Sequence, residues 1–186
     1  MQIWKLHIEA DRYAGFQPDD LSFFADRFEC RRMAADWAPP PVTVCGRSKP
    51  LPDFGSWMNK SPVVSERARD LVEQLAGADV EFLPFHPLKA KPYFVLNVVR
   101  CLDWLDPEHS DLGIAGRFAF RKDLPLDEYP IFKCTGLWDE IFVTSRFGEM
   151  MVANALRGAS LADPAEPTFR LLLAKAEVNR FPGLKP

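Results

Sequence analysis

Hydrophobic and polar residues alternate with two different periods along this chain, and the periods predict its strands and helices. Residues 3–8 (IWKLHI) alternate large and polar side chains, which predicts an opening strand with Ile3 turned inward. Residues 80–85 (VEFLPF) predict a second strand. Residues 93–102 (YFVLNVVRCL) hardly alternate, which is typical of a longer strand buried on both faces. Further strands are predicted over residues 116–121, 130–134 and 139–144.

One unit of sequence occurs twice, and each copy predicts an amphipathic helix. The copies are residues 63–77 (VVSERARDLVEQLAG) and 142–158 (FVTSRFGEMMVANALRG). Each has a β-branched approach, then Ser65 or Thr144 as the N-cap, then apolar residues at helical spacing, and a glycine beyond the last turn. The predicted apolar faces are Ala68, Leu71, Val72, Leu75 and Ala76 in the first copy, and Phe147, Met150, Met151 and Ala155 in the second.

An arginine occupies the second helical position in both copies, where the helix dipole disfavours a cation. We expect the guanidinium groups of Arg67 and Arg146 to fold away and donate to carboxylates or loop carbonyls, which would hold each strand-to-helix corner. A ligand-binding role is the alternative. Asn97 interrupts an apolar run, and a buried amide must find hydrogen-bond partners. We expect Ser65, Arg67, Asn97, Thr144 and Arg146 to be structural.

The remaining segments are mostly predicted loops, and the order of all the predicted elements indicates an α+β fold. Residues 19–33 are either a helix or an irregular aromatic-rich lobe, and residues 38–62 read as a Pro/Gly-rich loop for most of their length. Residues 167–178 predict a closing strand that could equally be helical near its end. Strands outnumber helices and arrive in runs, so we expect one α+β domain over residues 1–186. Its sheet should be mainly antiparallel or mixed, with the two amphipathic helices packed on it.

Composition excludes several classes of protein. Hydrophobic residues make up 47% of the chain and charged residues 26%, with a net charge of -3, which argues against a dedicated nucleic-acid binder. The N-terminal residues do not resemble a signal peptide and no apolar run approaches the length of a membrane span, so a cytoplasmic protein is expected. The four cysteines and three histidines lack ligand spacing, and catalytic motifs are missing. No metal, cofactor or catalytic residue is predicted.

Four short motifs give a family resemblance. They are residues 64–67 (VSER), 83–84 (LP), 97–103 (NVVRCLD) and 141–143 (IFV) before the second arginine. Over residues 54–158 the chain resembles the bacterial polymorphic-toxin immunity proteins of the eleventh family, formerly a domain of unknown function. Such proteins often repeat Ser-Glu-Arg-Phe, whereas this chain has TSRF at 144–147. Residues 11–52 match no pattern that we identify.

The resemblance implies a cytoplasmic protein, encoded beside a toxin, that binds and silences this cognate toxin domain without catalysis during interbacterial competition. It implies a protein partner rather than nucleic acid or a membrane, and a contact surface outside the structural motifs. Two other hypotheses remain open. One is an enzyme, such as a hydrolase that reverses a toxin's modification, and the other is a regulatory binding module without a toxin partner.

An acidic stretch is the predicted contact surface. Immunity proteins that block basic substrate channels commonly present acidic and aromatic groups, because complementary charge steers association and a buried aromatic ring adds affinity. The alternative is that the two tryptophans are core residues and the acids solvate a turn. The predicted partner-binding residues are Asp103, Trp104, Asp106, Glu108 and Asp111, with Trp57 from the Pro/Gly-rich loop.

Overall fold

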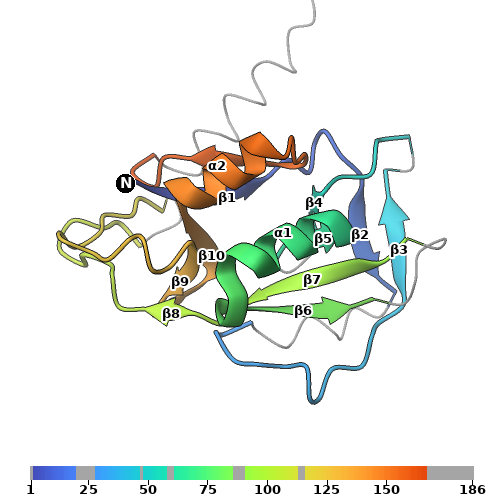
Figure 1. Ribbon diagram of the computed structural model, residues 1–186, viewed down its shortest axis with the longest axis horizontal. Coiled ribbons are helices and arrows are strands. Elements are labelled where there is room, and N and C mark those ends of the chain that lie inside the picture. The colour runs from blue at the N-terminus through green and yellow to red at the C-terminus, as the bar shows by residue number, and fades with distance from the viewer. Residues whose placement is uncertain are drawn as a thin grey trace, which may run out of the picture.

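Five strands form the larger sheet of the computed structural model, which describes residues 2–19, 28–46, 48–57, 61–85, 91–112 and 116–166. The strand order is β11-β1-β10-β9-β8, and Figure 1 labels all of these strands except β11. Neighbouring strands are antiparallel except β8 and β9, which are parallel. The bounds are Ile3–Ile8 (β1), Cys101–Leu102 (β8), Ile131–Cys134 (β9), Leu137–Thr144 (β10) and Ala159–Ala162 (β11).

Two smaller sheets complete the β-structure of the described residues, which therefore form three sheets instead of the single sheet expected from the sequence. Four strands form an antiparallel sheet in the order β4-β5-β7-β6, and β2 pairs with β3. The bounds are Gly15–Pro18 (β2), Val42–Cys45 (β3), Phe54–Gly55 (β4), Val63–Ser65 (β5), Val80–Pro84 (β6) and Tyr93–Val98 (β7). Residues 38–62, predicted as loop for most of their length, therefore contain two short strands.

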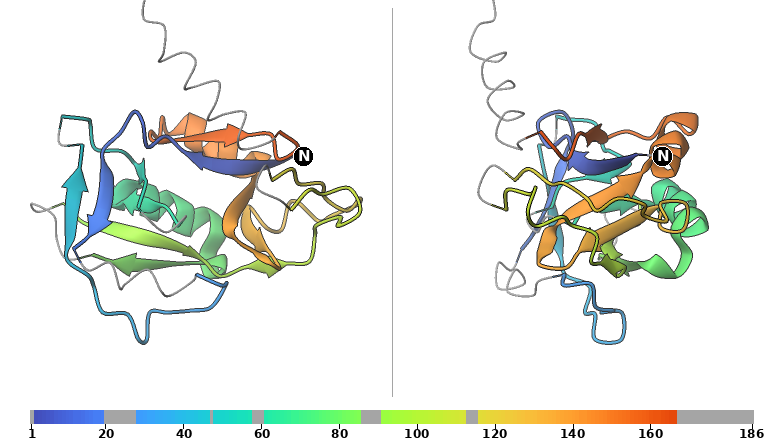
Figure 2. Two further views of the ribbon diagram at one scale, coloured as in Figure 1. Left: turned by 180° about the vertical axis from the view of Figure 1, so that it is seen from behind. Right: turned by 90° about the vertical axis from the view of Figure 1, so that its left-hand side faces the viewer.

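Both predicted helices are present and lie on one side of the molecule (Figure 2). Helix α1 spans Glu66–Ala76 and continues into a short 3-10 turn, Gly77–Asp79, and α2 spans Ser145–Ala153. Ala68 and Val72 of α1 share one buried core with Phe147 and Met151 of α2, and Val143 of β10 packs in the same core. The α+β prediction is confirmed. This core lies between the helices and the five- and four-stranded sheets.

Two strand predictions are wrong. Residues 93–102 do not form one strand: the chain leaves the four-stranded sheet after Val98 and enters the five-stranded sheet at Cys101. The carbonyl of Asp79 accepts the N–H groups of Val99 and Arg100 at 2.9 and 3.2 Å, which fixes this bend. Residues 116–121 form only isolated bridges, because their backbone donates to loop carbonyls instead of a neighbouring strand.

The predictions for residues 3–8, 80–85, 130–134 and 139–144 are confirmed within two residues; the largest difference is that β10 begins at Leu137. In the segment 19–33, residues 20–27 are outside the described part, and residues 28–33 are not helical. The predicted closing element at 167–178 also lies outside the described residues.

Candidate functional site

Ser65 holds the first strand-to-helix corner through a polar network. Its Oγ accepts the N–H of Ala68 at 3.3 Å and donates to Asp53 Oδ1 at 3.0 Å. The other carboxylate oxygen of Asp53 accepts the N–H of Arg157 at 3.0 Å. Asp53 is only 9% exposed, so the cap is held by a buried carboxylate whose two oxygens both accept hydrogen bonds. The predicted N-cap at Ser65 is confirmed.

The second corner is built differently. Thr144 precedes α2 as predicted, but its side chain makes no capping hydrogen bond. It is fully buried opposite Ile3 of β1, and its Oγ1 has no hydrogen-bond partner in the described structure. The helix also ends earlier than predicted, at Ala153, so Ala155 is not on its apolar face. Gly158 is likewise not a helix cap.

The two arginines donate to loop carbonyls. Arg67 donates to the carbonyl of Asn154, the residue that ends α2. Arg146 Nη1 donates to the carbonyl of Asp127 at 2.7 Å. Each arginine thus donates to a backbone carbonyl of another segment, which is the kind of contact that a structural role requires. How much each contact contributes to stability stays a prediction.

Asn97 helps to hold a segment that we call the bridging segment, residues 28–34. The Asn97 side chain is fully buried and donates to the carbonyl of Arg31 at 2.9 Å and to Glu81 Oε2 at 2.8 Å. Glu81 also accepts the N–H groups of Met33 and Ala34, each at 2.8 Å. The four-stranded sheet therefore holds this segment with a buried carboxylate.

The five-stranded sheet holds the same segment with a buried amine. Lys133 in β9 is 1% exposed, and its Nζ donates to the carbonyl of Phe28 at 2.8 Å. Burial lowers the pKa of Lys133 to about 8. Sequence reasoning did not single out Lys133 or Glu81, although each is a charge within an otherwise apolar strand. That pattern is the signal by which they could have been found.

The predicted acidic surface, which we call the acidic turn (residues 103–111), pairs two of its four carboxylates with arginines. Asp103 lies 2.9 Å from the guanidinium of Arg121, and Asp111 lies 3.7 Å from that of Arg117. Asp106 accepts a hydrogen bond from His109 at 2.8 Å, which holds the pKa of the Asp106 carboxyl below its ordinary value. The structure thus brings the predicted acids together but folds a basic stretch against them.

Both predicted tryptophans are buried, which agrees with the alternative that they are core residues. Trp104 is 9% exposed, and its ring packs on Phe132 with 4.8 Å between centroids. Trp57 is 6% exposed and packs on Phe85 at 5.0 Å. The two belong to different core clusters. Their burial argues against an aromatic anchor at these positions, and a partner-binding role for them stays a prediction.

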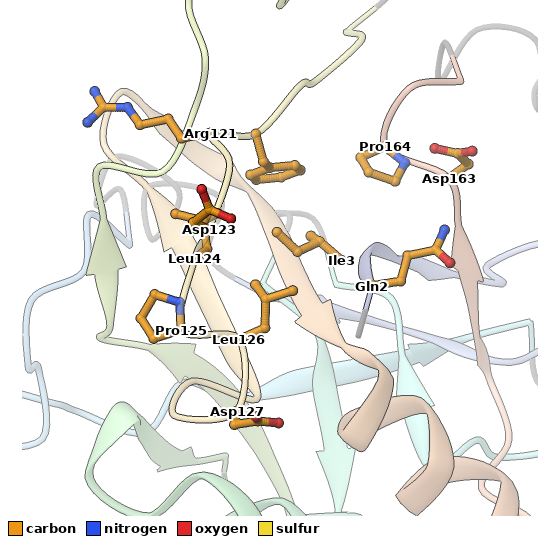
Figure 3. Close-up of a pocket in the computed structure, with 11 residues that line it drawn as sticks. Gln2, Ile3, Arg121, Asp123, Leu124, Pro125, Leu126, Asp127, Asp163 and Pro164 are labelled. Carbon is orange, nitrogen blue, oxygen red and sulfur yellow. The ribbon is translucent and has the colours of Figure 1, made fainter.

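Figure 3 shows a groove that the sequence did not reveal. Arg121, which pairs with Asp103 of the acidic turn, is one of the residues that line it. The volume of the groove is about 540 Å³, and it lies between the start of β1, the loop of residues 121–127 and the end of β11. Ile3, Leu124 and Leu126 contribute apolar surface, and three carboxylates line it: Asp123, Asp127 and Asp163. We call it the acidic groove. The first and last residues that line it, Gln2 and Pro164, are about 160 positions apart in the chain. No local sequence pattern could therefore indicate the groove.

Neither a metal site nor a membrane span is found within the residues that the structure describes. Within them, His, Cys, Asp and Glu side chains do not gather in any group of three that could hold a metal ion. None of their helices has the length and apolar character needed to cross a membrane.

Comparison with known proteins identifies the family. The model of the immunity protein family (Imm11) matches residues 17–166, about four-fifths of the chain. The match confirms the resemblance of residues 54–158 and extends it into the N-terminal region, where sequence analysis had found no pattern. A search of curated proteins finds no match. The chain belongs to the immunity protein family (Imm11).

Proposed function

We propose that this protein binds a cognate toxin domain and neutralises it without catalysis. Membership of the immunity protein family carries the proposal, because that family implies a toxin as the partner. Within this proposal the toxin belongs to a polymorphic system used in competition between bacteria, and binding takes place in the cytoplasm. Neutralisation then depends on a surface that fits one toxin, rather than on a reaction.

The acidic turn is the first part of the proposed contact surface. Its ion pairs with Arg117 and Arg121 support a fixed shape, which reduces the conformational entropy lost on binding. Glu108 is exposed and forms no ion pair in the described structure. Leu112, directly after the turn, is 58% exposed. We propose Leu112 as the apolar contact in place of the two buried tryptophans.

Titration of toxin activity separates inhibition from enzymatic reversal. The toxin domain encoded by the neighbouring gene is produced with and without this protein, and its activity is measured against increasing protein. A binding inhibitor should abolish activity at about one equivalent and co-purify with the toxin. Full protection at a small fraction of an equivalent would favour the enzyme hypothesis. Absence of both protection and complex formation would favour a module without a toxin partner.

A charge reversal tests the acidic turn. Glu108→Lys should slow association with the toxin domain, with a larger effect at low salt, because complementary charge steers encounter and salt screens it. Glu73→Lys on the exposed face of α1 is the matched control. Asp106 is unsuitable for reversal because its carboxylate also accepts the N–H groups of Glu108 and His109. Equal association rates for wild type and Glu108→Lys would remove the turn from the interface.

A further inference from the structure

We propose that the acidic groove receives a basic segment of the toxin domain, with an apolar side chain on the groove floor and flanking lysine or arginine residues on its rim. This inference rests on the proposed function, since it names a second contact surface and the chemistry of the segment that fits it. It does not depend on the acidic turn being part of the interface.

The apolar part of the groove can accept one or two side chains. Ile3 at the base is 8% exposed, and Leu124, Leu126 and Phe120 are partly buried against the same core cluster. Pro125 lies on the side of Leu124 and Leu126, and Pro164 lies on the opposite side beside Asp163 (Figure 3). A volume of about 540 Å³ is within the size range of pockets that enclose small ligands or side chains.

The charges around the groove favour a basic occupant. Asp123, Asp127 and Asp163 line it. In the described part of the chain, no cation forms an ion pair with Asp123 or Asp127. Lys5, buried in β1, offsets part of the charge of Asp163. A lysine or arginine placed here would meet two carboxylates, Asp123 and Asp127, that form no ion pair within the described residues.

Arg121 lines the groove, but its guanidinium pairs with Asp103, outside the groove lining. Its Nη2 lies 2.9 Å from Asp103 and its Nε donates to the carbonyl of Leu105 at 3.2 Å. Figure 3 shows the guanidinium pointing away from the groove. Because Arg121 contacts the acidic turn, the turn and the groove adjoin, and one partner could cover both.

The groove wall is held in place before any partner binds. Arg146 of α2 donates to the carbonyl of Asp127, and the N–H of Glu128 donates to the carbonyl of Pro125 at 3.1 Å. On the opposite wall, Asp163 accepts the N–H of Ala165 at 2.9 Å. Preorganised carboxylates lose little freedom when a cation binds, which favours affinity.

The test replaces the rim carboxylates by amides of the same shape. The groove variant is Asp123→Asn, Asp127→Asn and Asp163→Asn together; the amide oxygen can still accept the turn hydrogen bond of Asp163. The control variant, Asp36→Asn with Glu73→Gln and Glu149→Gln, changes net charge equally at exposed positions elsewhere. Binding to a catalytically inactive form of the toxin domain encoded by the neighbouring gene is measured at low and high salt.

We expect the groove variant to associate about tenfold more slowly than wild type at low salt, and the control within about twofold. Leu126→Gln, which retains the rim charges, should mainly accelerate dissociation. Thermal unfolding of each variant confirms that it is folded. If wild type binds and both triple variants bind alike, the groove is not the site. If wild type itself does not bind, the proposed function fails instead.

Discussion

The two copies of the strand–helix unit have similar sequences but are stabilised by different means. In β5–α1, Ser65 caps the helix and the N–H of Gly77 donates to the carbonyl of Glu73. In β10–α2 the N-cap side chain is unpaired in the described structure and no glycine ends the helix. However, β10 has eight residues and lies between β1 and β9, whereas β5 has only three. Where tertiary pairing is extensive, local capping signals become dispensable.

The arginines extend this difference. Arg67 of the first unit contacts the end of the second helix, so it joins the two units. Arg146 of the second unit contacts Asp127 and so joins that unit to the acidic groove. A shared sequence position therefore has two separate tasks, one within the fold and one beside the proposed interface.

The glycines provide the largest expected contrast between the units. Gly158 has a φ of 99°, and a Cβ there would lie 2.1 Å from the carbonyl oxygen of Phe54. Gly77 has a φ of 52° with nothing within 4 Å of a Cβ. Gly158→Ala should cost about 3 kcal/mol or more of unfolding free energy, and Gly77→Ala about 1 kcal/mol. Urea unfolding measures both, and similar costs would contradict this view of Gly158.

The sheets of the two units hold the bridging segment with opposite buried charges. The four-stranded sheet of β5 uses the carboxylate of Glu81, and the five-stranded sheet of β10 uses the amine of Lys133. The pKa of Lys133 is lowered from its ordinary value of 10.5 to about 8 in the folded protein. At a pH between these two values, the Lys133 amine is therefore protonated more often in the unfolded state than in the folded state. Stability from this residue should therefore rise with pH, by about 1 kcal/mol between pH 7 and pH 9.

Lys133→Met is the matched variant for this pH dependence. It should remove the rise, and unfolding in urea at pH 7 and pH 9 compares the two proteins. The comparison stops at pH 9 because burial raises the pKa of the Cys30 and Cys134 thiols from 9.0 to about 12, which lowers stability in both proteins as the pH approaches and passes 9. Parallel pH profiles in both proteins would show that Lys133 does not titrate in this range.

Removing each arginine tests their separate tasks. Arg67→Ala and Arg146→Ala should each cost about 1 kcal/mol, since an exposed charged hydrogen bond contributes less than a buried one. Arg146→Ala should additionally weaken toxin binding, because it releases the groove loop at Asp127. Arg12→Ala, which loses an exposed pair with Glu9, is the control. If Arg67→Ala weakened toxin binding and Arg146→Ala did not, the tasks assigned to the two arginines would be reversed.

The N-caps give the smallest and most direct contrast. Ser65→Ala should cost about 1 kcal/mol, because it removes a capping acceptor and leaves Asp53 short of one donor. Thr144→Val should be neutral or slightly stabilising, since it replaces a buried hydroxyl that has no partner in the described structure by a methyl group of similar size. Thermal unfolding of the two variants decides the matter. A large loss in Thr144→Val would reveal a partner for this hydroxyl.

Sequence alone predicted the features that depend on neighbouring residues. The alternation of residues 3–8 and the spacing from Ala68 to Ala76 each arise within one element, so β1 and α1 were predicted correctly. Thr144 has the residue type of a cap, but its burial against β1 is a tertiary property. The acidic turn looked like a charged surface because its pairing with Arg117 and Arg121 requires the chain to fold back.

The position of β1 has a consequence for how the protein is made. This strand lies between β10 and β11, so its partners are separated from it by roughly 130 to 150 residues of chain. Such distant pairing slows folding. At ribosomal speeds of about 5 to 20 residues per second, β1 waits roughly 7 to 30 s for its partners to be synthesised. Under the proposed function, a toxin present in the producing cell would meet a complete inhibitor only after that delay.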